Sequence, residues 1–147
     1  MKWVLKHFNE LEVDELYKIL RLRNEIFIVE QNCPYQDCDN KDKDAYHLYF
    51  ENDEGIVAYV RILKKGTSYE EASIGRVVCS IDYRGSGIAK ECMEKAIGFI
   101  EEVLGESDIR ISAQEYAKGF YEKLGFKKVS DIYLEDDIPH IEMLYSK

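Results

Sequence analysis

The sequence predicts an α/β protein in which a mixed β-sheet packs against helices. Apolar residues recur at helical spacing in two well-separated segments, β-rich runs follow one another in the middle of the chain, and strands alternate with helices in the second half. The chain has 147 residues, 46% of them apolar and 33% charged, with no repeat and no linker rich in Pro, Gly or Ser. We therefore expect one globular domain over residues 1–147 with a core of its own.

The first half of the chain predicts a strand, a helix, a long loop and a hairpin. Trp3 and Leu5 alternate with other residues as in a strand. Asp14 and Glu15 stand at the start of a helical pattern, where carboxylates favour the helix dipole, and Arg23 interrupts its apolar stripe. The expected elements are a strand at Lys2–Phe8, a helix at Val13–Ile28, a long loop or a loop with one short helix at Glu30–Ala45, and hairpin strands at Tyr46–Asn52 and Ile56–Leu63.

The second half predicts strands that alternate with two helices. A β-rich run ends at a glycine-containing turn, and a helix that stops at Gly105 follows it directly. The expected inward face of that helix is Ile88, Cys92, Ala96, Phe99, Ile100 and Val103. The other expected elements are strands at Ser73–Ile81, Ile109–Ser112, Phe126–Ser130 and Ile138–Tyr145, a helix at Glu115–Leu124, and an acidic turn at residues 135–137.

The charge of the chain limits its partners. A formal net charge of −9 argues against general nucleic-acid binding, which needs a basic surface, and suits a cationic partner better. No stretch approaches the roughly 18 apolar residues of a membrane span, and the first residues lack the features of a signal peptide. We expect a cytoplasmic protein with no membrane partner; a homodimer is compatible with the sequence.

The four cysteines do not form a disulfide scaffold in a chain of this size. Cys79 and Cys92 lie among apolar residues and are interpreted as small core residues. Cys33 and Cys38, with His47 further along, lack the paired spacing of zinc ligands, so we expect no metal. His47 is expected in core or loop packing.

The segment Arg84–Ala89 is the most informative part of the sequence. It joins a strand to a helix through Gly85, Ser86 and Gly87, an arrangement in which backbone N–H groups and the helix dipole favour an anion. A P-loop would need a Gly-Lys-Ser/Thr ending, and a dinucleotide fingerprint would need Gly or Ala where Lys90 stands. A tight turn that binds no ligand stays open as the alternative.

Two motifs resemble those of the GNAT acetyltransferases. Arg84-x-x-Gly87-x-Ala89 is similar to the family's Gln/Arg-x-x-Gly-x-Gly/Ala loop, and Tyr121-Glu122-Lys123-Leu124-Gly125-Phe126 resembles its Tyr-x-x-Leu-Gly-Phe signature about thirty residues later. The resemblance covers essentially the whole chain and is strongest to the ElaA-like branch, through Phe27-x-Val29-Glu30-Gln31-x-Cys33-Pro34-Tyr35-Gln36-Asp37, Ile74-Gly75-Arg76-Val77-Val78 and Ile138-Pro139-His140-Ile141. It implies a central, mixed and mostly antiparallel twisted sheet flanked by helices.

The resemblance also implies a cofactor and its contacts. Acetyl-CoA would be the acyl donor, with its pantetheine arm on the backbone of Val77, Val78 and Cys79. Its pyrophosphate would lie on the turn formed by Arg84, Gly85, Ser86, Gly87, Ile88 and Ala89. Gln114 stands where many relatives carry Asn, which leaves one cofactor hydrogen bond in doubt.

In that family an amine attacks the thioester directly, without an acyl-enzyme. The resemblance assigns protonation of the leaving thiolate to Tyr121, and a backbone N–H near Val78 and Cys79 would polarise the carbonyl. The general base stays open: His140 has a suitable intrinsic pKa, and Glu30 or Glu142 could act through water.

The acceptor is expected to be a primary amine, on a small molecule or a peptide. The loop that begins at Glu30 is expected to shape its site, with Glu30, Gln31 and Tyr35 as substrate-binding residues. Two other hypotheses remain at this point: a non-catalytic acyl-CoA sensor, and a structural module whose glycine turn binds nothing.

Overall fold

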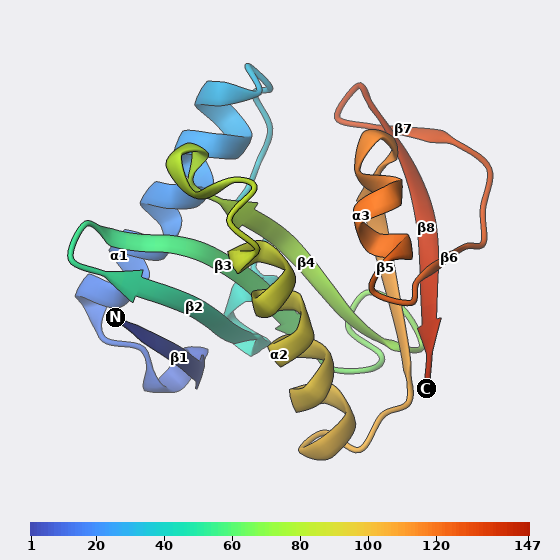
Figure 1. Cartoon of the computed structure of the whole chain (residues 1–147), viewed down its shortest axis with the longest axis horizontal. Helices are drawn as coiled ribbons and strands as arrows, with labels where there is room; N and C mark the ends of the chain where they lie inside the picture. Colours follow the sequence, from blue (N-terminus) through green and yellow to red (C-terminus); the bar gives the residue numbers. More distant parts are fainter.

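Eight strands form one mixed sheet in the computed structural model, which describes all 147 residues (Figure 1). The strand order is β1-β2-β3-β4-β5-β8-β6, and β7 pairs with a different part of β8 from that paired with β6. All pairs are antiparallel except β4 with β5. The strands are β1 (Lys2–His7), β2 (Tyr46–Asn52), β3 (Gly55–Leu63), β4 (Ala72–Cys79), β5 (Asp108–Gln114), β6 (Lys127–Lys128), β7 (Tyr133–Glu135) and β8 (Ile138–Ser146).

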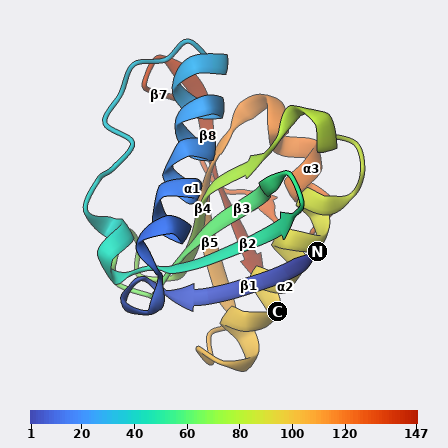
Figure 2. The same cartoon turned by 90° about the vertical axis from the view of Figure 1, so that its left-hand side faces the viewer.

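Helices cover both faces of this sheet (Figure 2). One core packs α2 and the α3 region against it and contains Ile100, Ile111 and Phe126; the other packs α1 against it and contains Ile19 and Tyr59. None of the helices has the length and apolar content needed to cross a bilayer. The helices are α1 (Val13–Arg23), α2 (Ile88–Glu102) and α3 (Lys118–Glu122), with a π-helix η2 (Asn24–Glu30) and 3-10 turns η1 (Phe8–Glu10), η3 (Lys41–Asp44), η4 (Ile81–Tyr83) and η5 (Glu115–Ala117).

The sheet opens between its two parallel strands. β4 and β5 are paired only at Ala72 with Ile109 and at Ser73 with Arg110, and beyond these residues they diverge (Figure 1). Backbone groups on the β5 side of Gly75 to Cys79 therefore have no strand partner. This opening is the structural basis of the site described below.

A β-bulge at Arg76 changes which side chains of β4 point to each face of the sheet. Tyr59 pairs with Val78 but Arg61 pairs with Gly75, so β4 holds one extra residue, and Arg76 has a left-handed φ of 50°. Before the bulge, Ile74 packs in the core on the α2 side. After the bulge, Val77 packs on this same side and Val78 packs on the α1 side. Without the extra residue the alternation would place Val77 and Val78 on the opposite faces.

Most predicted elements are present, with corrections at the ends. The helix predicted over Val13–Ile28 changes to a π-helix at Asn24. Arg23, predicted as a break in the apolar stripe, is fully buried because carboxylates from the following loop pair with it.

The second half of the chain has further corrections. Val103 is exposed although it was predicted to face inward, because the helix ends at Glu102, and Ile81 lies in an exposed 3-10 turn after the strand rather than in it. The predicted strand 126–130 shortens to two residues, and the predicted helix 115–124 divides into η5 and α3. Strand β7 was not predicted.

Candidate active site

A cavity of about 600 Å³ lies at the opening between β4 and β5. It is lined from the α2 and α3 side by Ala89 and Tyr121, and from the α1 side by Phe27, Tyr35 and His140. The cavity therefore reaches both faces of the sheet. We call the first part the α2 end and the second the α1 end.

The α2 end is built on the glycine turn that the sequence singled out. Gly85 and Gly87 have φ values of 81° and 89°, which favour glycine, and no atom lies within 4 Å of where a Cβ would stand on either. The turn leads straight into α2, with Gly87 as its N-cap residue, and the Ser86 hydroxyl donates to the Tyr83 carbonyl. The N-terminus of this fifteen-residue helix lies beside the cavity, and its free backbone N–H groups and dipole favour binding of an anion.

The predicted cofactor residues divide into two groups in the structure. Val77, Val78, Cys79, Arg84, Ala89, Gln114 and Tyr121 line the cavity, whereas Gly85 to Ile88 form the turn between two of its lining residues. All of them therefore lie at or next to one cavity.

Arg84 and Glu30, two partly exposed residues of the cavity lining, form an ion pair. Its Nη1 and Nη2 lie 2.6 Å from the two carboxylate oxygens of Glu30, and its Nε donates to the Cys79 carbonyl at 3.3 Å. The hydrogen bond from Arg84 lowers the pKa of Glu30, so the carboxylate is charged at neutral pH. Glu30, expected among the acceptor-binding residues, thus contacts the residue expected to meet the cofactor.

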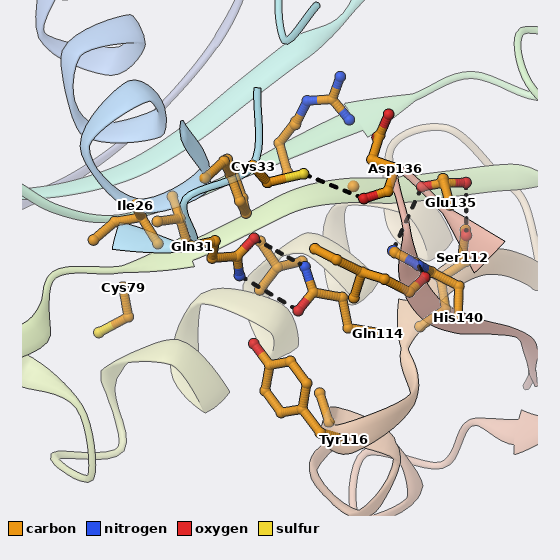
Figure 3. Close-up of a pocket in the computed structure, with 18 of the residues that line it drawn as sticks. Ile26, Gln31, Cys33, Cys79, Ser112, Gln114, Tyr116, Glu135, Asp136 and His140 are labelled. Atoms are coloured by element: carbon orange, nitrogen blue, oxygen red, sulfur yellow. Dashed lines mark hydrogen bonds and ion pairs between the residues drawn. The ribbon is translucent and has the colours of Figure 1, made fainter. Parts of the chain in front are cut away.

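Gln31 and Gln114 join the two sides of the opening (Figure 3). Each side-chain amide donates to the other, at 3.4 Å and 3.3 Å, although the residues come from the end of η2 and the end of β5. Nearby, the Cys33 thiol donates to the Asp136 carbonyl at 3.3 Å. The two halves of the chain are therefore held together across the site by side chains rather than by a strand ladder.

Tyr121 lines the cavity, and its hydroxyl forms no hydrogen bond within the chain. Its ring is 8% exposed and packs edge-on against Phe120 and Phe126, while its hydroxyl is not fully enclosed. Burial raises the pKa of this phenol, with a smaller contribution from Tyr116. The phenol is therefore protonated at neutral pH and is available as a hydrogen-bond donor.

His140 lies at the α1 end of the cavity and is 6% exposed. Its Nδ1 lies 2.7 Å from the Ile138 carbonyl, which can only accept, so Nδ1 carries the proton. Its Nε2 lies 3.5 Å from Oε2 of Glu135 (Figure 3). Nε2 is thus the ring nitrogen that faces the Glu135 carboxylate.

Sequence reasoning missed two cavity residues beside His140, Ser112 and Glu135. In the sequence, Ser112 ends a predicted strand and Glu135 belongs to an acidic turn, and neither pattern indicates a site. The register of β8 with β5 and β7 brings them together, and no local pattern reports that register.

Tyr35 lines the α1 end and is held by an ion-pair network. Its hydroxyl donates to Asp37 at 2.9 Å, its ring faces the Arg76 guanidinium at 5.6 Å, and burial raises its pKa. In this network Arg23, Arg61 and Arg76 meet Asp37, Asp39 and Asp42, with N–O distances of 2.7–3.3 Å. The network fixes the loop after η2 against the sheet.

The cysteines do not gather at one site. Cys92 is in the core as predicted, but Cys79 is only half-buried and lines the cavity, which corrects its interpretation as a core residue. Burial raises the pKa of the Cys79 thiol, which disfavours a nucleophilic thiolate. Cys33 is buried, Cys38 is exposed, and His47 is buried between the Tyr59 hydroxyl and the Asp42 carbonyl. No group of three or more His, Cys, Asp or Glu residues is placed to hold a metal ion.

A mixed sheet that opens at a parallel strand pair, with a glycine turn and a helix N-terminus at the opening, defines the class of GNAT-type acyltransferases. Residues 6–147 match the family model for an acetyltransferase (GNAT) domain. The chain therefore belongs to the GNAT acetyltransferase family, whose members use acyl-CoA.

Within the family the chain belongs to the ElaA-like branch. It is 40% identical to the protein ElaA of Escherichia coli (strain K12) over 146 residues, covering 97% of this chain and 95% of that protein. The crystal structure of E. coli ElaA matches with a TM-score of 0.92 at 38% identity, covering 99% of this chain and all of that one. The crystal structure of an acyl-CoA N-acyltransferase from Pseudomonas aeruginosa matches with a TM-score of 0.93 at 39% identity and the same coverage.

Proposed function

We propose that the protein transfers an acetyl group from acetyl-CoA to a primary amine by direct attack of the amine. The observation that carries the proposal is one cavity that reaches both faces of the sheet, with an anion-binding turn at the α2 end and proton-accepting side chains at the α1 end. Two substrates can then approach one point from opposite sides. A sensor that only binds acyl-CoA has no need of the second end.

The α2 end fits a CoA diphosphate. The open space before Gly85 and Gly87 leaves the backbone N–H groups at the start of α2 accessible to phosphate oxygens. The unpaired edge of β4 at Val77 to Cys79 offers backbone hydrogen bonds to an extended, amide-containing arm. Acetyl-CoA, when bound, supplies an acetyl group activated as a thioester.

Tyr121 is the proposed proton donor to the leaving sulfur. The residue lines the cavity, and its hydroxyl has no competing partner in the chain and stays protonated because burial raises its pKa. A positioned acid of this kind contributes roughly 100-fold or more to a rate. A backbone N–H of the open β4 edge, near Val78 and Cys79, would stabilise the developing oxyanion.

His140 is the proposed proton acceptor at the α1 end. Its Nδ1–H is held by the Ile138 carbonyl, which leaves Nε2 to take the proton that the amine gives up. Gln31 and Tyr35 line the same end and are proposed to contact the acceptor. The acidic net charge of the chain favours approach of a cationic amine.

The test compares wild type with Tyr121→Phe, using calorimetric titration of acetyl-CoA and thiol release across a panel of primary amines. We expect acetyl-CoA affinity to change by less than about twofold and kcat to fall about 100-fold, because Phe keeps the ring packing and removes the proton. Tyr17→Phe, on the exposed face of α1, is the matched control and should behave as wild type.

Three outcomes would contradict parts of this account. An unchanged kcat in Tyr121→Phe would remove Tyr121 from the chemistry. Binding of acetyl-CoA without transfer to any amine would favour the sensor. No binding of acetyl-CoA would contradict both the transferase and the sensor.

A further inference from the structure

Two hydrogen-bond acceptors face each other at the α1 end of the cavity. Oε2 of Glu135 and Nε2 of His140 are 3.5 Å apart, a contact that is an ion pair only while His140 carries a proton on both ring nitrogens; with neutral His140 both atoms are acceptors. We propose that this pair is the subsite that binds the ammonium group of the acceptor, with Glu135 as the residue that recognises its charge. The inference rests on the proposed function and adds to it the residue that recognises the charge of the acceptor.

The tautomer of His140 determines what the pair can bind. Since Nδ1 donates its proton to the Ile138 carbonyl at 2.7 Å, neutral His140 presents a lone pair at Nε2. A carboxylate oxygen and an imidazole lone pair cannot satisfy each other. They are both satisfied by one group that carries a positive charge and at least two N–H donors, which describes a primary ammonium.

Glu135 is held in place by its other oxygen. Ser112 donates to Oε1 of Glu135 at 3.3 Å, so the Tyr133 hydroxyl must be the donor in its short contact with Ser112. The Tyr133 ring stacks on His140 at a centroid distance of 6.1 Å. This arrangement aims Oε2 toward His140, while the Glu135 side chain stays half exposed and within reach of an incoming ligand (Figure 3).

The strand register places these residues on one face of the sheet. Gln114 is opposite His140 across β5 and β8, and His140 is opposite Tyr133 across β8 and β7. Ser112 is two residues before Gln114 and therefore points to the same face. The subsite is thus part of the sheet, with Glu135 at the end of β7 next to the turn that joins β7 to β8.

The charges around the pair leave a net negative site. Asp136 also lines the cavity, and its carbonyl already accepts from Cys33. Arg110, two residues before Ser112 on β5, is paired with Glu71 and Glu142 at 2.9–3.1 Å, and Arg76 is paired with Asp37 and Asp39. No unpaired cation of the cavity lining competes with an ammonium at Glu135.

The proton balance follows from the same geometry. The bound ammonium gives one proton to Nε2 of His140, and Glu135 stabilises the resulting imidazolium. The amine nitrogen then bonds to the acyl carbon as the carbon–sulfur bond breaks, and the sulfur takes the phenolic proton of Tyr121. Tyr121 recovers a proton through solvent as the new amide nitrogen loses its second one, so one proton is released per turnover.

The first test is binding, which needs no turnover. The three histidines of the 147-residue chain are labelled, and the His140 ring resonances are followed while n-butylammonium chloride is added, with sodium chloride as the ionic control. We expect a saturable shift in wild type that Glu135→Gln weakens about tenfold and Asp137→Asn, an exposed acidic neighbour, leaves unchanged. No shift in wild type, or equal shifts in all three proteins, would overturn the proposal.

The second test is kinetic and separates this inference from the proposed function. For Glu135→Gln we expect KM for n-butylamine to rise about tenfold while KM for trifluoroethylamine, largely uncharged at neutral pH, changes less than about twofold. Equal losses for both amines would contradict ammonium recognition at Glu135. A wild type that binds n-butylammonium at His140 but acetylates no amine would instead contradict the transferase and keep the subsite.

Discussion

The two ends of the cavity are built in different ways. The α2 end consists of a contiguous turn and a helix N-terminus, and the backbone N–H groups of Gly85 to Ile88 form most of its candidate anion site. The α1 end is assembled from side chains on η2, β5, β7 and β8, and the loop beside it is held by the Arg23 network. The α2 end should therefore tolerate changes in side-chain charge, whereas the α1 end should be sensitive to single charges and to pH.

The difference also separates what the two ends can recognise. Backbone N–H groups and a helix dipole bind a phosphate whatever side chains the turn carries. Side chains brought together from distant segments can change one at a time, so the acceptor can differ while the donor stays the same. The ion pair of Arg84 with Glu30 is a direct charged contact between the two ends.

The largest effect is expected from the buried network behind the α1 end. Asp42 is 7% exposed and pairs with Arg23 at 2.7 Å and Arg61 at 3.0 Å. Asp42→Asn keeps the shape but leaves two buried guanidinium groups without that charge, so we expect a loss of about 3–5 kcal/mol in the free energy of unfolding. Thermal denaturation should show a midpoint lower by about 10 °C.

Asp44→Asn is the matched control for this prediction. It lies on the same 3-10 turn but is exposed, so its midpoint should match wild type. Equal midpoints for the two variants would show that the network does not hold the loop.

The second largest effect is expected on acidification, which should lower the free energy of unfolding through protonation of Asp39. Burial alone would raise the pKa of this carboxyl, but hydrogen bonds from Arg61 and the charge of Arg76 outweigh it and lower the pKa to about 2. Because the folded pKa lies below the unfolded value of about 3.9, the stabilisation is present above pH 4 and is lost as pH falls toward 2. The loss should be about 2 kcal/mol, after allowance for partial exposure of the side chain.

Urea unfolding of wild type and Asp39→Asn between pH 6 and pH 2 measures this contribution. The variant should be less stable at pH 6 and should lose less on acidification. Two parallel stability profiles would contradict the assignment to Asp39.

The smallest effect is expected at the contact between the two ends. Glu30→Gln removes a carboxylate that occupies the Arg84 guanidinium in the lining of the cavity. Since exposed pairs contribute about 0.2–1 kcal/mol, acetyl-CoA affinity in calorimetry should rise roughly threefold. Glu25→Gln, exposed on the same π-helix, should leave it unchanged, and a weaker affinity in Glu30→Gln would show that Glu30 supports the cofactor rather than competing with it.

The α2 end could be predicted from the sequence better than the α1 end, because its residues are contiguous in the chain. The glycine turn and Tyr121 stand in short contiguous motifs, so their elements could be predicted directly. Arg23 looked like a break in a helix because its partners Asp37 and Asp42 are 14 and 19 residues away. Ser112 and Glu135 meet only through the pairing of β8 with β5 and β7, and that register depends on packing across the whole sheet.

Calorimetric titration of acetyl-CoA into wild type, Gly87→Val and Gly98→Ala tests the central claim most directly. Gly87 has a φ of 89°, where a β-branched residue costs at least about 1–2 kcal/mol, whereas Gly98 lies inside α2 with no neighbour within 4 Å of an added Cβ. We predict micromolar-range binding to wild type and Gly98→Ala and binding about tenfold weaker or lost in Gly87→Val. Absence of binding to wild type, or equal binding to all three proteins, would contradict a cofactor site at the start of α2.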